Sequence, residues 1–180
     1  MELSDVIAAR RSIRKFKQQD ISTDNVRLLL DAARLAPSGS NLQPARFIVA
    51  QSPASKEALA RYTPYKFIAK AAVIFVCCAD LATITTRDTR VGELLQEGAF
   101  EGVDMDMNDP SAVSPVMDAE AVKAYLAMNV AIAIEHIILK SVDLGLGSCW
   151  VGRFNRDKVR NFLALDESIH PVALLPVGYP

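Results

Sequence analysis

The segment Ala36-Pro37-Ser38-Gly39-Ser40-Asn41-Leu42-Gln43-Pro44 decides how the first part of the chain is organised. Four apolar residues before it repeat at i, i+3, i+4 and i+7, a spacing typical of a helix packed on a core; they are Val26, Leu29, Leu30 and Ala33. A proline disfavours helical geometry at the residue before it, so this helix is expected to end at Ala36. The Ser, Gly and Asn residues that follow therefore form a polar loop at a helix terminus, beside the core.

A basic cluster, Arg10-Arg11-Ser12-Ile13-Arg14, precedes this loop by one predicted helix. Arginine offers forked donors that suit a phosphate, and Ser12 adds a hydroxyl. The Ser, Asn and Gln side chains of the loop offer neutral donors and acceptors that suit sugar hydroxyls and a ring edge. The two segments together predict a two-part holder for an anionic, aromatic cofactor. The alternative is a solvated helix end, and a loop whose polar side chains satisfy their own backbone.

Composition narrows the class of protein. The chain has 180 residues, 51% of them hydrophobic, which predicts a single domain over residues 1–180. The formal charge of −1 argues against a nucleic-acid partner, because such modules carry a basic excess. The three cysteines have no metal-ligand spacing and fit a reducing compartment. No signal peptide opens the chain and no apolar run is expected to reach the length of a membrane span, so we expect a soluble, cytoplasmic protein.

Helices come first along the chain, and strands separated by helices follow, which predicts an α+β fold with helices packed on a small mixed sheet. We expect strands at 47–50, 71–79, 148–152 and 172–177, and helices at 4–9, 23–35, after Pro53, at 118–144 and after Asn155. The helix over 118–144 ends at Gly145 and is apolar on nearly every side, so it is expected to be buried, either centrally or against a second subunit. Glu135 on this helix then needs a partner.

These motifs, with Gly145-Leu146-Gly147-Ser148-Cys149-Trp150-Val151-Gly152-Arg153-Phe154 and the closing Pro176-Val177-Gly178-Tyr179-Pro180, resemble the nitroreductase family of FMN-dependent oxidoreductases. The resemblance covers nearly the whole chain. It implies the nitroreductase fold, an intertwined homodimer with the flavin at the interface, and NAD(P)H as a transient donor. It also implies a ping-pong reaction in which electrons pass to a nitroaromatic, a quinone or a similar small acceptor.

The resemblance also implies cofactor-binding residues, while the chemistry is carried by FMN rather than by a catalytic side chain or a metal. The basic motif would hold the phosphate and ribityl end, and the polar loop would reach the flavin from the partner subunit. Backbone N–H groups near Gly152 would point to the N5 and O4 edge of the ring. The implied residues are Arg10, Arg11, Ser12, Arg14, Pro37, Ser38, Gly39, Asn41, Gln43, Val151, Gly152 and Arg153.

Two departures from the family pattern leave alternatives open. Ala45 stands where relatives often have Trp, and many relatives continue past the Gly-Tyr-Pro end into a basic tail, for which Lys66 and Lys70 are candidate substitutes. The region 83–117 is expected to be a helical excursion, either a lid over the acceptor or a surface feature. The remaining alternatives are reductive dehalogenation or flavin reduction on the same fold, a flavin-binding or sensing protein without turnover, and an anion-binding scaffold without flavin.

Overall fold

A computed structural model of the chain describes residues 2–103 and 116–180. Four strands form one sheet in the order β1-β2-β4-β3. Their bounds are β1 (Ala45–Ala50), β2 (Val73–Asp80), β3 (Gly147–Ser148) and β4 (Ile169–Gly178). All ladders between these strands are antiparallel, and among the described residues the parallel component of the expected mixed sheet is a single bridge between Ser12 and Ser148.

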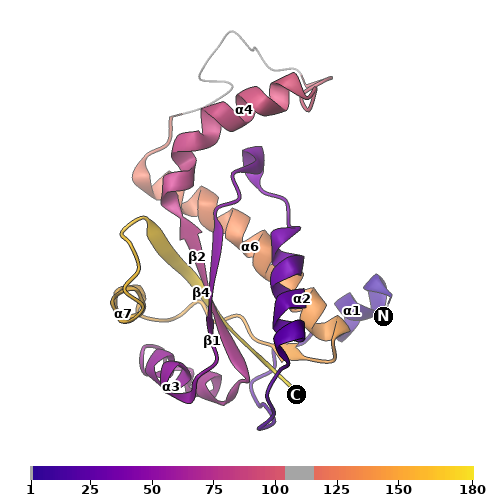
Figure 1. Cartoon of the computed structure of the whole chain (residues 1–180), viewed down its shortest axis with the longest axis vertical. Helices are drawn as coiled ribbons and strands as arrows, with labels where there is room; N and C mark the ends of the chain where they lie inside the picture. Colours follow the sequence, from indigo (N-terminus) through magenta and orange to yellow (C-terminus); the bar gives the residue numbers. More distant parts are fainter. Residues whose placement is uncertain (1, 104–115) are drawn as a thin grey trace.

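Helices cover both faces of this sheet, as Figure 1 shows: α2 and α6 lie on one side, and α3 and α7 on the other. The helix bounds are α1 (Leu3–Ala9), α2 (Thr23–Arg34), α3 (Pro53–Arg61), α4 (Arg87–Gln96), α6 (Ala119–Asp143) and α7 (Arg156–Phe162). Three short 3-10 helices follow α2, α3 and β2, respectively: η1 (Gly39–Asn41), η2 (Lys66–Lys70) and η3 (Leu81–Thr86). The expected α+β fold is confirmed.

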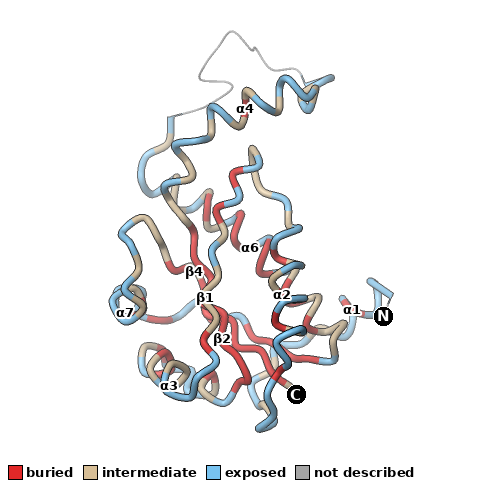
Figure 2. Tube along the Cα trace, in the orientation of Figure 1, coloured by how far each residue is buried: buried red, intermediate tan, exposed pale blue. Residues whose placement is uncertain are grey.

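The central strand β2 joins the two halves of the core. Its side chains alternate between faces, as the pleat requires. Phe75 and Cys77 pack with α2 and α6, whereas Ile74, Val76 and Cys78 pack with α3 and α7. Figure 2 shows the buried residues concentrated along β2 and β4. Burial raises the pKa of Cys77, and raises that of Cys78 to about 12, so both thiols stay protonated at neutral pH and serve as packing.

Helix α6 is central, but one side of it faces outward in the single chain. Met128 is 58% exposed and Ile132 is 37% exposed. Glu135 is exposed as well, so the expectation that it is buried and requires a partner was wrong. By length and composition α6 is also apolar enough to cross a membrane, contrary to the sequence-based expectation. Core helices of soluble proteins share that property, and α6 packs against α2 and β2.

Two predicted regions have different bounds in the structure. The strand expected at 148–152 is reduced to β3, after which Val151 makes only an isolated bridge to Leu174. The excursion expected over 83–117 contains the end of η3 and all of α4, which lies away from the sheet at one end of the molecule (Figure 1). The part of that prediction that covers residues 104–115 lies outside the described residues.

Candidate functional site

The basic segment, residues 10–14, lies against the edge of the sheet. It leaves α1 after Ala9, and Ile13 N–H then donates to the carbonyl of Ser148 at 2.9 Å. Gly147 faces Ile13 so closely that a Cβ added there would lie 2.5 Å from Ile13 Cγ1. The absence of a side chain at Gly147 therefore allows the basic segment to pack on β3, and this packing sets the position of its arginines.

A small cavity of about 130 Å³ opens where the basic segment meets the residues after β3. Its lining combines two arginines with three aromatic side chains and the segment after β3: Arg14, Tyr65, Phe67, Cys149, Trp150, Val151, Gly152 and Arg153. Aromatic walls with a few polar groups suit a planar ring, and arginine suits a negative charge. The structure thus brings together two of the three segments predicted to bind the cofactor. Sequence reasoning missed Tyr65 and Phe67.

Some charged groups near this cavity are already engaged within the protein. Arg11 donates to the carbonyls of Ala8 and Arg10, both at 2.7 Å, and so caps the end of α1. Lys66 donates to the carbonyls of Ala60 and Thr63 at 2.8 and 2.9 Å, where it caps α3.

Burial raises the pKa of the Cys149 thiol, although Arg14 and Ser12 act in the opposite direction. The cavity therefore presents a protonated thiol rather than a nucleophilic thiolate.

The polar loop, residues 37–44, has a backbone that few side chains tolerate. Ser40, Asn41 and Gln43 have φ values of 49°, 50° and 48°, in the left-handed region. Ser38 Oγ accepts from Gln43 N–H at 2.9 Å, and Arg46 donates to the carbonyl of Gln43 at 2.9 Å. These bonds satisfy the backbone N–H and C=O groups of Gln43, which make no hydrogen bond within a helix or a sheet. The side chains of Asn41 and Gln43 remain exposed and available to a ligand.

Asn129 on α6 anchors this loop. Its Oδ1 accepts from Gly39 N–H at 2.6 Å and its Nδ2 donates to the carbonyl of Tyr125 at 2.8 Å, while the residue is only 4% exposed. Sequence reasoning missed Asn129. The available signal was an amide side chain in an otherwise apolar helical run, since a buried amide requires partners. Nδ1 of His136, on the same helix, lies 3.1 Å from the carbonyl oxygen of Ala32, so this ring links α6 to α2.

The loop and the basic segment lie toward opposite ends of α6. Asn129 holds the loop, whereas Ser141, near the helix end, accepts from Leu146 N–H just before β3. Residues 129 to 141 of α6 rise by about 18 Å at 1.5 Å per residue. Figure 1 shows the same separation, with α1 near one end of α6 and the turn after α2 near the other. A single chain therefore does not bring the two halves of the predicted holder together.

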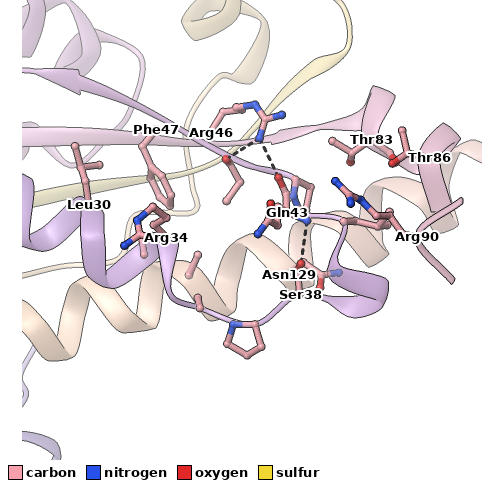
Figure 3. A pocket seen from close by; sticks show the side chains of 17 residues that line it. Leu30, Arg34, Ser38, Gln43, Arg46, Phe47, Thr83, Thr86, Arg90 and Asn129 are labelled. Atoms are coloured by element: carbon pink, nitrogen blue, oxygen red, sulfur yellow. Dashed lines mark hydrogen bonds between the residues drawn. The ribbon is translucent and has the colours of Figure 1, made fainter. Parts of the chain in front are cut away.

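A larger cavity, of about 610 Å³, lies beside the loop. Its walls come from the end of α2, the loop, the start of β1, and the η3 and α4 segment (Figure 3). Arg34, Arg46 and Arg90 contribute guanidinium groups to its lining. Asn129 and Ala133 form its floor on α6, so the residue that anchors the loop also borders this cavity.

Comparison with known proteins agrees with this arrangement. The sequence model described as the nitroreductase family matches residues 7–179. The chain belongs to the nitroreductase family. The resemblance inferred from the basic segment, the loop and the residues around Gly152 is therefore confirmed.

Relatives of this nitroreductase-family chain are similar over nearly its whole length. A protein of Thermus thermophilus named NADH dehydrogenase is 30% identical over 177 residues, which cover 95% of this chain and 83% of the relative. A Bacillus subtilis protein named FMN reductase (NADPH) is 32% identical over 98% of this chain and 65% of its own length. A crystal structure of a nitroreductase family protein from Clostridium novyi is 26% identical, with a TM-score of 0.74, and covers 100% of this chain and 86% of that protein.

The fold itself is also shared with a candidate nitroreductase of Exiguobacterium sibiricum, solved in complex with FMN. That structure has a TM-score of 0.80 at 22% identity and covers 99% of this chain and 88% of the other. The nitroreductase fold expected from the sequence is therefore confirmed.

We expect Gly39→Ala to displace the loop of this nitroreductase-family chain. A Cβ at this position would overlap the Tyr125 hydroxyl and lie 2.9 Å from Tyr125 Cζ, which is closer than packed atoms approach. FMN affinity, followed by flavin fluorescence quenching, should fall, and adding Tyr125→Ala should restore part of it. Gly92→Ala is the matched control, because an added Cβ meets nothing within 4 Å there. Equal affinities of the wild-type and Gly39→Ala proteins would contradict a role for this close contact.

Proposed function

We propose that this chain is an FMN-dependent NAD(P)H oxidoreductase in which residues 1–180 form one FMN-binding domain. It takes hydride from NAD(P)H and passes electrons to a nitroaromatic, quinone or similar small acceptor in two alternating half-reactions. The family membership and the relatives named NADH dehydrogenase and FMN reductase (NADPH) support the donor and the flavin. The buried, unpaired cysteines fit a cytoplasmic location.

The observation that carries the proposal is the cavity that combines Arg14, three aromatic rings and Gly152. FMN, when bound, supplies the chemistry: its ring accepts hydride at N5 and later gives up electrons. Arg10, Ser12 and Arg14 would hold the phosphate and ribityl end. Gly152 and Arg153 are exposed, and their backbone N–H groups would donate to a ring edge on which negative charge develops.

The site is complete only in a homodimer, on this proposal. The cavity beside Arg14 measures about 130 Å³, below the range of roughly 300 to 1,000 Å³ typical of small-molecule sites, so one chain encloses only part of a flavin. The second half, the polar loop, lies toward the other end of α6 in the same chain. Two chains related by a twofold axis would place the loop of one against the basic segment of the other, since such interfaces are self-complementary.

Exposed apolar side chains mark a surface that a second copy would cover. They are Leu3 and Ile7 on α1, Leu28 on α2, Leu35 directly after α2, and Met128 and Ile132 on α6. Three adjacent helices thus present large apolar groups to solvent in the single chain, and a homodimer would bury them. The sequence left open whether this helix is buried centrally or against a second subunit, and on this proposal α6 is covered by both.

An absorbance spectrum of purified protein supplemented with FMN, followed by anaerobic addition of NADH and then NADPH, tests the proposal. Flavin bands that are retained after gel filtration and then bleach on addition of either donor are the expected result. Bands that persist with both donors would instead support a flavin-binding protein without turnover. A protein that retains no FMN would contradict the proposed function.

Arg10→Ala should weaken FMN binding by about tenfold or more, because a charge-assisted hydrogen bond contributes roughly 1.5 to 3 kcal/mol. Lys17→Ala is the control, since Lys17 lies outside the basic segment and its backbone N–H bonds to Tyr179. Titration of each apoprotein with FMN measures both affinities. Equal losses in the two variants would exclude a specific phosphate contact at Arg10.

Flavin reduction is the second candidate function. It is favoured by the relative named FMN reductase (NADPH), which is 32% identical to this chain. A flavin reductase would release reduced FMN, so a second, free flavin would act as the acceptor. Steady-state rates with free FMN and with a quinone, each measured at saturating NAD(P)H, would separate the two candidates.

A further inference from the structure

The larger cavity has the size and character of a ligand site in its own right. Its volume of about 610 Å³ lies within the usual range for small-molecule sites, roughly 300 to 1,000 Å³. One wall is the polar loop proposed to contact the flavin, and α4, which packs against η1 in that loop, contributes Arg90 beside it (Figure 3). Leu30, Leu42 and Phe47 give it an apolar side. A ligand with a planar or apolar body would therefore fit beside the loop.

Among the described residues, the side chains that line this cavity include basic but no acidic groups, and each of its arginines pairs with a carboxylate just outside the lining. Guanidinium groups reach it from three elements, with Arg34 at the end of α2, Arg46 on β1 and Arg90 on α4, and none of the described residues that line it is acidic. In Figure 3 the Arg90 side chain extends from α4 toward Gln43, and Arg34 lies beside Phe47. Positive groups that border a partly apolar cavity favour ligands with a negative charge.

Two of these arginines keep N–H donors that can bind a ligand, whereas the third uses its donors in bonds within the protein. Arg46 donates to the carbonyls of Gln43 and Ala45 and pairs with Asp80 at 2.9 Å. Arg34 pairs with Asp31 through Nε alone, at 3.2 Å, and Arg90 pairs with Glu93 through one nitrogen, at 2.7 Å. Each guanidinium has five N–H donors, and exposed pairs of this kind contribute little stability, so both can turn additional donors to a ligand.

We propose that Arg34 and Arg90, which border the cavity from two sides, make it a site for an anionic group, a carboxylate or a phosphate, on the molecule that exchanges electrons here. The identification of that molecule as an electron donor or acceptor rests on the proposed function, but the anion site itself does not require a flavin. Two sources have this chemistry: an aromatic acceptor that carries a carboxylate, and the additional phosphate that distinguishes NADPH from NADH. One of the two arginines holds the anionic group, and the apolar side chains of the lining contact the body of the ligand.

The test compares charged and neutral ligands in matched variants. Arg34→Gln and Arg90→Gln remove one charge each, and Arg27→Gln is the control, because Arg27 lies on the same helix, forms a similar i,i+3 pair with Asp24, and does not line the cavity. Flavin-loaded enzyme is assayed with 4-nitrobenzoate and with 4-nitrobenzamide, which has the same shape without the charge. A second arm compares NADPH with NADH. Calorimetric titration of 4-nitrobenzoate into flavin-free protein gives a readout that is independent of turnover.

For an acidic acceptor, we expect kcat/KM for 4-nitrobenzoate to fall by about tenfold or more in at least one cavity variant, with the amide changed by less than about twofold. If the anionic group is instead the additional phosphate of NADPH, the ratio of kcat/KM for NADPH to kcat/KM for NADH should fall by the same factor. Unchanged discrimination in both arms, in enzyme whose flavin still bleaches, overturns the anion site and leaves the proposed function standing. If the protein binds no FMN, the proposed function fails instead. Calorimetry then decides the site alone: weaker 4-nitrobenzoate binding in the cavity variants supports it, and no binding or equal binding overturns it.

Discussion

Gly147→Ala is expected to weaken FMN binding by at least about tenfold, the equivalent of one lost charge-assisted contact. An added Cβ would lie 2.5 Å from Ile13 Cγ1 and 2.9 Å from Ile13 Cβ. Because Ile13 Cβ is attached directly to the backbone, a change of rotamer does not relieve the overlap, and the basic segment has to move. The bond from Ile13 N–H to the Ser148 carbonyl, 2.9 Å long, would then stretch or break. Arg14, which lines the cavity, and Arg10 in the same segment would then be displaced together.

A rescue experiment distinguishes this local displacement from general unfolding. Circular dichroism and urea unfolding should show that Gly147→Ala keeps the fold, and FMN titration should show the loss of affinity. Ile13→Gly in the same chain removes the three side-chain atoms that the new Cβ would meet, and should recover affinity. Gly92→Ala again controls for the glycine-to-alanine change itself. An unaltered FMN dissociation constant in Gly147→Ala would show that the position of the basic segment does not matter for binding.

Asn129→Ala is expected to lower the free energy of unfolding by about 1 to 3 kcal/mol, the usual cost of leaving a buried hydrogen-bonding group without its partner. The change removes the acceptor of Gly39 N–H and the donor to the Tyr125 carbonyl. The loop residues with positive φ values then lose their connection to α6. Because strained backbone persists only when its surroundings hold it, we expect the loop to become mobile and FMN binding to weaken.

Urea unfolding gives the stability change, and hydrogen exchange of the Gly39 amide reports the loop directly. Asn129→Asp keeps an acceptor for Gly39 N–H but places a carboxylate against the Tyr125 carbonyl, so it should protect the Gly39 amide better than Asn129→Ala does. Asn161→Ala on α7 is the control, since Asn161 is exposed. Protection of Gly39 that is equal in all three variants would contradict the anchoring role.

Local sequence signals predicted the elements well. The side chains of Ser22, Asp118 and Asn155 accept from backbone N–H groups at the starts of α2, α6 and α7, where these residue types are preferred. Gly145 has a φ of 70° just after α6, as expected for a helix that ends in a left-handed turn. These features depend on neighbours within four residues, so they can be read from the chain directly.

Contacts between distant parts of the chain were not predictable in this way. Gly39 and Asn129 are 90 positions apart, and nothing local to either residue indicates the bond between them. The exposed face of α6 escaped prediction because an apolar helix has the same pattern whether the protein core or a second chain covers it. The distance between the loop and the basic segment escaped it too, because the spacing of motifs along a chain does not give their separation in space.

The placement of the two half-sites toward opposite ends of α6 has a genetic consequence under the proposed homodimer. One lesion at Arg10 and another at Asn129 would each inactivate both sites when all chains carry the same change. A mixed dimer of the two mutant chains would pair the intact basic segment of one with the intact loop of the other, and both lesions would fall in the second site. Two defective alleles expressed in one cell would then complement each other, with up to half of the sites in each mixed dimer restored.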